Sequence, residues 1–473
     1  MTDTEPSAPI PTTLEEILLP LTEAAKKYRS SGELAQARGI LQQAIQHCQR
    51  FGDTVREGSA LQMLAAVELD NSNFETAFQL HQKAIELHTA ANRRDLVIPS
   101  ISGIGYIYQV QGQYELALAN AVEALSMSRE CGNRRFEALM LGNLAVLHIE
   151  LKQLSEAKLC LEQALEYHRA DGHREQEAQC LIDYSKILTF QDALQEAIDT
   201  ADQAIEIAKE MNLQNKKALA LSSKGLALLE ANRWAESAQC TGEALAIFRE
   251  IGNRRFVTIT LSNYGLALQN DNRPEAAEAA YREVIELCRA SDDHHSAGYA
   301  MLNLGVLLIS TNRFVEAERL IIEAVEIYRG AHNDAILSVA LFDLAVCYIT
   351  RSDWAQANDC ISQAIALDNE WVTIKQNPLL YAVAAACCAA LGDWKESDAI
   401  ITKLKTEESN DDAGIYFAIK LAEGFRSLIK GNQTLVDEII ARVSEKMIHD
   451  NICLYSEIGV LRKLLERSKN AYR

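Results

Sequence analysis

The sequence predicts an all-α solenoid, a stack of repeated helix pairs, and three series of small residues at a constant interval predict it. The first series begins at Ala25 and has Ala, Gly or Ser at every fortieth position as far as Ala385. A second series begins at Ala37 and a third at Ala44, and both keep the same interval, with Val284 the one larger residue. A period of 40 residues held over most of a chain is typical of stacked helical repeats and not of a globular enzyme.

Each repeat is expected to hold two amphipathic helices. In the repeat 134–173, apolar residues recur at three- and four-residue spacing over 134–151 and again over 154–170, which is the helical pattern. Lys152 and Gln153 form the turn between them, and Gly172 can adopt the left-handed conformation that ends a helix. Because one pair cannot bury its own apolar face, every pair must stack on its neighbours.

The pattern divides the chain into four parts. We expect a disordered tail over residues 1–13 and a regular array over 14–371. Two degenerate pairs follow over 372–450, where Phe425 and Asp437 replace small residues, and a capping helix follows over 451–473. A terminal cap covers the last apolar layer of a solenoid, so one is required there.

The offsets between the three series are 12 and 7 residues, which are the offsets between the small positions of the tetratricopeptide repeat. A large residue also recurs at the expected turn position, as in Phe74, Tyr114 and Trp234. The chain therefore resembles tetratricopeptide-repeat proteins, and among them the 40-residue arrays of the LGN, kinesin-light-chain and Rap types. The resemblance implies a right-handed α-solenoid of about eleven pairs plus the capping helix.

The composition is acidic, with 46 Lys and Arg against 66 Asp and Glu, a net charge of −20 and a pI near 5.0. Nucleic acid requires a basic face, and an anionic membrane surface requires clustered basic residues, so both are disfavoured as partners. A basic peptide or protein surface is the better electrostatic match. The alternative is that the charge only keeps a long solenoid in solution.

The cysteines and the N-terminus indicate the compartment. Of eleven cysteines, Cys160, Cys240 and Cys360 share one repeat position, and none has the paired spacing of a metal or disulfide site. The N-terminus lacks the basic patch and apolar stretch of a secretory signal, and no apolar run is long enough to span a bilayer. We therefore expect a cytoplasmic protein that does not insert into a membrane.

No catalytic motif, cofactor loop or metal-ligand spacing stands out. The sequence lacks the phosphate loop, the dinucleotide fingerprint, the nucleophile elbow and the zinc-protease motif. His294 and His295 stand at a repeat boundary, where an exposed polar loop is the simpler interpretation. We expect no enzyme activity and no cofactor.

The resemblance implies that the first helix of each pair lines a concave groove. The positions two residues before the first small series, which we call the ladder positions, are polar in the middle of the chain: Asn143, Asp183, Ser223, Asn263, Asn303 and Asp343. By resemblance, the three asparagines hold the backbone of an extended peptide, since an amide both donates and accepts. An apolar strip runs beside them: Tyr106, Val146, Leu226, Leu266, Val306 and Ile309. The alternative is that polar residues are merely tolerated on a solvated face.

These observations predict a non-enzymatic adaptor that binds an extended segment of a partner protein, with basic and hydrophobic residues, in its groove. Two further hypotheses stay open: a bacterial peptide-sensing regulator of the Rap kind, and a kinesin-light-chain-like cargo adaptor or scaffold. A clamp for a terminal carboxylate is disfavoured, because only Lys26, Arg29 and Lys186 are basic on the inward positions. The chain is expected to be a monomer or to self-associate weakly.

Overall fold

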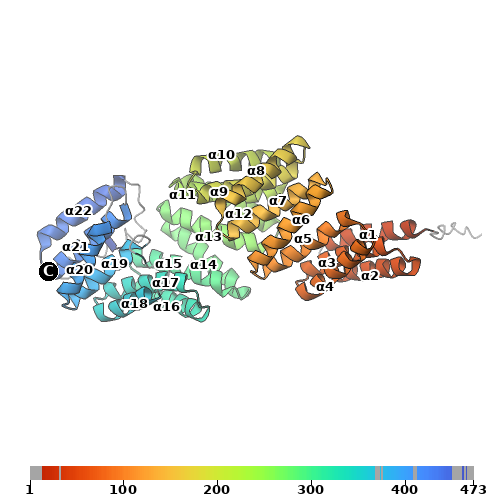
Figure 1. Ribbon diagram of the computed structural model, residues 1–473. Helices are drawn as coiled ribbons and strands as arrows, with labels where there is room; N and C mark the ends of the chain where they lie inside the picture. The colour runs from red at the N-terminus through yellow and green to blue at the C-terminus, as the bar shows by residue number, and fades with distance from the viewer. Residues whose placement is uncertain are drawn as a thin grey trace, which may run out of the picture. The chain divides into compact units, whose positions relative to one another are not determined.

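The computed structural model describes residues 13–30, 33–367, 373, 377–407, 413–449, 461, 462 and 465, and every regular element in these ranges is a helix (Figure 1). The helices are α1 (Leu14–Ser30), α2 (Leu34–Phe51), α3 (Thr54–Asp70), α4 (Phe74–Ala90), α5 (Arg94–Val110), α6 (Tyr114–Glu130), α7 (Arg134–Glu150), α8 (Leu154–Ala170), α9 (Arg174–Phe190), α10 (Leu194–Glu210), α11 (Gln214–Glu230), α12 (Trp234–Glu250), α13 (Arg254–Asn270), α14 (Pro274–Ala290), α15 (His294–Ser310), α16 (Phe314–Gly330), α17 (Asp334–Thr350), α18 (Trp354–Ala366), α19 (Pro378–Ala390), α20 (Trp394–Glu407), α21 (Ala413–Ile429) and α22 (Gln433–His449). The predicted all-α stack of helix pairs is confirmed.

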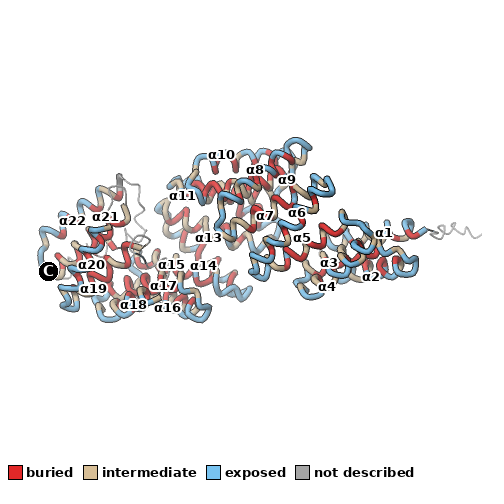
Figure 2. Tube along the Cα trace, in the orientation of Figure 1, coloured by how far each residue is buried: buried red, intermediate tan, exposed pale blue. Residues whose placement is uncertain are grey.

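The chain forms two compact units. The first unit, Met1–Leu213, holds α1 to α10, and the second unit, Gln214–Arg473, holds α11 to α22. Within each unit an odd-numbered first helix packs on the even-numbered second helix that follows it, and each pair packs on the next. In Figure 2 the buried residues line the contacts between helices, while the turns are exposed.

A half-repeat of 20 residues underlies the period of 40. From α2 to α18 the helices begin every twenty residues, and all but the first and last of these are 17 residues long with three-residue turns between them. The middle turn residue has a positive φ, whether it is Gly132 (66°), Lys152 (59°) or Asn232 (56°). The N–H of the third turn residue reaches back five positions, as from Gln153 to the His148 carbonyl at 2.8 Å, which satisfies a carbonyl at the helix end.

Small residues let the two helices of a pair approach closely. A Cβ added at Gly225 would lie 2.5 Å from Thr241, and one added at Gly305 would lie 2.6 Å from Ile321. In both cases the partner stands sixteen residues further along, on the second helix of the same pair. At these two positions the absence of a side chain on the first helix leaves the space that a larger side chain of the second helix occupies.

Two expectations concern residues outside the described ranges. The tail was expected over 1–13, and of these only Thr13 is described. The capping helix was expected over 451–473, and of these only Leu461, Arg462 and Leu465 are described. Leu461 and Leu465 are buried, and the Arg462 guanidinium donates to the Ser444 hydroxyl at 3.2 Å.

Candidate functional site

Two predicted site residues lie together on the first-helix face of the first unit, by which we mean the side of the first helices that carries the ladder positions. Asn143 of α7 donates from its amide to the Ser102 hydroxyl of α5 at 3.4 Å. Tyr106 of α5 is half exposed, and both Tyr106 and Asn143 line a cavity of about 40 Å³ between α5, α6 and α7. Met140 and Leu147 supply its apolar wall. An amide and an aromatic ring thus share one hollow.

The neighbouring ladder position is already paired. Asp183 of α9 is half-buried and accepts hydrogen bonds from the Gln179 amide at 2.8 Å and from the Lys186 ammonium at 3.0 Å. Val146, one turn along α7 from Asn143, is half-buried as well. The Asp183 carboxylate therefore carries a counter-ion from its own helix.

In the second unit the predicted residues differ in accessibility. Asn263, Asn303, Leu226, Leu266 and Val306 are half-buried, so part of each side chain meets solvent. By contrast, Ser223, Ile309 and Asp343 keep no more than about 5% of their surface exposed. The accessible part of the predicted strip in this unit is thus the two asparagines and the three half-buried apolar residues.

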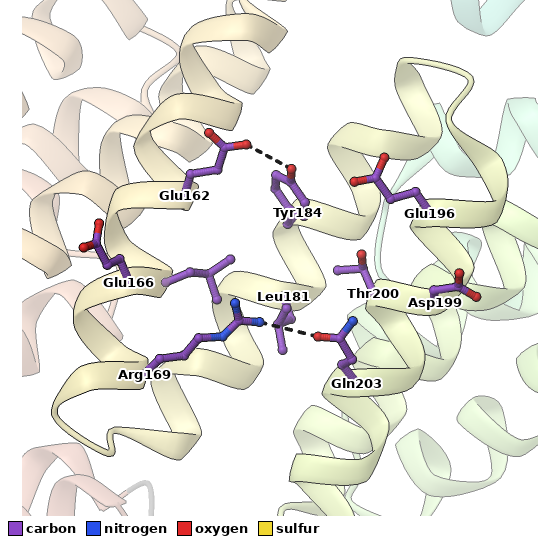
Figure 3. Close-up of a pocket in the computed structure, with 10 residues that line it drawn as sticks. Glu162, Glu166, Arg169, Leu181, Tyr184, Glu196, Asp199, Thr200 and Gln203 are labelled. Atoms are coloured by element: carbon purple, nitrogen blue, oxygen red, sulfur yellow. Dashed lines mark hydrogen bonds between the residues drawn. The ribbon is translucent and has the colours of Figure 1, made fainter.

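A larger pocket lies elsewhere in the first unit, between α8, α9 and α10 (Figure 3). It encloses about 680 Å³ and has Glu162 and Glu166 on α8 and Glu196 and Asp199 on α10. The Tyr184 hydroxyl of α9 donates to the Glu162 carboxylate at 3.1 Å. Burial raises the pKa of the Tyr184 phenol, which stays protonated and able to donate.

Arg169 closes one end of this pocket. Its guanidinium donates to Gln203 of α10 at 3.4 Å and to Glu177 of α9 at 3.0 Å. The same link from one second helix to the next recurs at Arg249, Arg289 and Arg329, each bonded to Glu or Gln 34 positions further along. Sequence reasoning missed this role, although a basic residue at the same repeat position could have indicated it.

The described cysteines are free thiols, and most of them are buried or half-buried. Burial raises the pKa of Cys48, Cys288 and Cys360 to about 11, so these side chains are neutral near pH 7. Within the described residues, no group of three or more His, Cys, Asp or Glu side chains is arranged to hold a metal ion. None of the described helices is both long enough and apolar enough to cross a bilayer.

Two family models match the chain. The model of the MalT-like tetratricopeptide region matches residues 253–429, and a tetratricopeptide-repeat model matches residues 97–170. The chain is a tetratricopeptide-repeat protein. The matched segments fall in both units, in agreement with the predicted repeat register. No curated protein sequence matches the chain significantly.

Solved structures share the fold of this repeat protein at low sequence identity. The apo form of the quorum sensor NprR from B. thuringiensis is 15% identical with a TM-score of 0.56, and the match covers 76% of this chain and 100% of that one. PH0952 from Pyrococcus horikoshii, a signal-transduction ATPase with a tetratricopeptide-repeat sensor, is 15% identical with a TM-score of 0.57. That match covers 74% of this chain and 52% of PH0952. At 15% identity, the similarity to these structures shows a shared fold and nothing further.

Proposed function

We propose that this repeat protein is a non-enzymatic scaffold that binds an extended segment of a partner protein on its first-helix face. The observation that carries the proposal is the hollow of Tyr106 and Asn143, in which a half-exposed ring stands beside a half-buried amide. Tetratricopeptide folds are generally interaction modules, and this one offers polar and apolar groups side by side on an accessible face.

The chemistry of that face suits a peptide backbone. The Asn143 amide can donate to a peptide carbonyl and accept from a peptide N–H, and its bond to Ser102 at 3.4 Å is long enough to be exchanged. The Tyr106 ring supplies apolar area with little rotamer entropy to lose. Asn263 and Asn303 repeat the amide in the second unit, beside Leu266 and Val306. Each unit thus carries its own pairing of amide and apolar side chain.

The partner segment is proposed to be basic and hydrophobic. The net charge of −20 attracts a positively charged segment, and the apolar residues beside the asparagines offer anchoring surface. We propose a reducing, cytoplasmic compartment, because the described cysteines are free thiols.

Peptide sensing is the second candidate. NprR is described as a quorum sensor and the repeats of PH0952 as a sensor, and the whole NprR chain is covered by the match. A short free peptide and a long protein segment differ in the number of repeats that they contact. Cross-linking from several ladder positions in turn distinguishes them, since only a long segment reaches positions in many repeats.

Site-specific photo-cross-linking tests the proposal. Benzoylphenylalanine at position 106 is expected to capture the partner from an extract of the source cells, because the Tyr106 side chain is 52% exposed beside Asn143. The same group at position 122 is the matched control, since Val122 is 53% exposed but lies on the second helix α6. Capture from 122 and not from 106 would move the binding face to the second helices.

A further inference from the structure

We propose that the pocket between α8, α9 and α10 is a second docking site, which takes arginine side chains of a partner protein segment. It is formed by second helices and by the side of α9 that carries Leu181 and Tyr184. With 3.6 residues per turn, the ladder residue Asp183 and its partner Lys186 lie on another side of α9. The site is therefore separate from the first-helix face, and the proposal does not depend on binding there.

The charge of the pocket is unbalanced. Four carboxylates line it, those of Glu162, Glu166, Glu196 and Asp199, and Arg169 is the one basic residue among the lining side chains. Lys158 stands nearby, with its ammonium 5.6 Å from the centre of the Tyr184 ring. Even with both cations counted, the pocket keeps an excess of negative charge that a cationic ligand would neutralise.

Two of the carboxylates are available. Glu162 accepts from Tyr184, and Asp199 accepts from the Gln195 amide at 2.8 Å. Within the described part of the chain, Glu166 on α8 and Glu196 on α10 make no hydrogen bond and no ion pair, although the Lys158 ammonium attracts the Glu196 carboxylate from a greater distance. A carboxylate of this kind stands on each side of the pocket, so a ligand can be held from both second helices.

The hydroxyl of a largely buried threonine in the pocket lining points to a ligand independently of charge. Thr200 of α10 is 5% exposed, and its hydroxyl makes no hydrogen bond in the described residues. Figure 3 shows this hydroxyl directed into the space between Tyr184 and Glu196. A helical threonine usually bonds a carbonyl of the preceding turn, as Thr189 does with Ser185 at 2.9 Å. Thr200 is left to bond whatever enters the pocket.

The arginine side chain fits these groups best. Its planar guanidinium has five donors, which can serve a carboxylate in bidentate fashion and a hydroxyl acceptor at the same time. The volume of about 680 Å³ lies within the range of ligand pockets and exceeds one side chain, so it accommodates the flanking backbone of an extended segment. The acidic charge of the whole chain favours the approach of such a segment.

Fluorescence anisotropy with the full chain tests the site, using fluorescein-labelled tetra-arginine as the probe. The pocket variant is Glu166→Gln with Glu196→Gln. The control variant is Glu123→Gln with Glu156→Gln, which removes the same charge from exposed positions of the same unit outside the pocket. The pocket variant is expected to raise Kd about tenfold and the control variant no more than about twofold.

Thr200→Val adds a test that does not change charge. It keeps the shape of the side chain and removes the hydroxyl, so an expected rise of about threefold in Kd reports the hydrogen bond. Circular dichroism of each variant checks that the helices are retained.

Several results would overturn the proposal. Equal losses in the pocket and control variants would mean that the general acidity of the chain binds the probe, as would the absence of saturable binding. A competition experiment with spermidine tests the class of ligand. If spermidine displaces tetra-arginine at comparable concentration, and its binding is weakened equally by the pocket variant, the pocket binds a small polyamine and not a protein segment.

Discussion

At the scale of single residues, the fold depends on matched sizes across each helix pair. Three glycines of the first small series stand opposite a larger side chain sixteen residues later: Gly225 faces Thr241, Gly265 faces Tyr281 and Gly305 faces Ile321. Most alanines of the same series have a leucine or isoleucine at the same offset in the sequence, as Ala145 has Leu161, and both of these residues are buried. The sequence predicts the small positions from their period, but the partner that fills each gap becomes clear only from the packing.

Replacing Gly265 by leucine is expected to force α13 away from α14. A Cβ at this position would lie 2.8 Å from the buried Tyr281 ring, which has no room to move. We expect a loss of about 1–3 kcal/mol or more in the free energy of unfolding, measured by urea titration with circular dichroism. Gly142→Leu on α7 is the control, because a Cβ there meets no atom within 4 Å. Equal midpoints for the two variants would show that the helix register is wrong.

Because of His81, the stability of the first unit is expected to depend on pH. His81 is 4% exposed, both ring nitrogens lack a partner in the described residues, and burial lowers its pKa to about 4 from 6.5. The folded state therefore favours the neutral ring, and the stability that this contributes is present above pH 6.5 and is lost as the pH falls toward 4. The loss is expected to reach about 3 kcal/mol.

His81→Leu is the variant that isolates this effect. Two other repeats have leucine at the position that corresponds to His81, namely Leu41 and Leu161. The site is therefore expected to accommodate a leucine side chain. In urea unfolding at several pH values below 6.5, the free energy of unfolding should fall less for the variant than for the parent. If it falls equally for both proteins, other groups cause the pH dependence.

At the scale of the helices, one turn geometry is used throughout. Asparagine, aspartate and glycine occupy most of the left-handed turn positions, which suits their tolerance of positive φ. The sequence indicated some of these turns through their glycines, as at Gly172. Lys152 and His332 adopt the same conformation at φ 59° and 51° without that signal, because the packing of the flanking helices fixes the turn.

Exchanging two turn residues tests this account of the turns. Lys152→Gly is expected to raise the free energy of unfolding by about 1 kcal/mol, because lysine pays a steric cost in the left-handed region. Gly172→Lys, in the next turn of the same repeat, is expected to lower it by a similar amount. Thermal unfolding of the two single variants and the parent measures both changes. Changes of the same sign in both variants would contradict a common turn geometry.

At the scale of the whole molecule, the sequence predicted more of the fold than of the site. The period of 40 determined the helix pairs, because a repeat imposes the same packing on every copy. The ladder positions were placed on one face, yet Ser223 and Asp343 are buried there, because the local fit of neighbouring first helices differs from repeat to repeat. The pocket of α8 to α10 depends on the spacing between second helices, which a sequence pattern does not report.

Stability is expected to vary along the chain. The helices of the pair α19 and α20 have 13 and 14 residues, whereas the regular helices have 17. Shorter helices have fewer backbone hydrogen bonds to resist local unfolding. Amide hydrogens in α19 to α22 should exchange faster than those in α13 to α16, measured by mass spectrometry of peptides from the intact chain. Uniform protection across these helices would contradict the expectation.

The most direct test of the central claim is a titration of the captured partner against the variant Asn143→Ala, Asn263→Ala, Asn303→Ala. Each lost amide leaves a peptide group of the ligand without its partner, which costs about 1–3 kcal/mol where the contact is buried. The account predicts weaker binding with an unchanged unfolding midpoint, because all three side chains are only half-buried on the first-helix face. Equal affinity of the parent and the triple variant for the partner would contradict it.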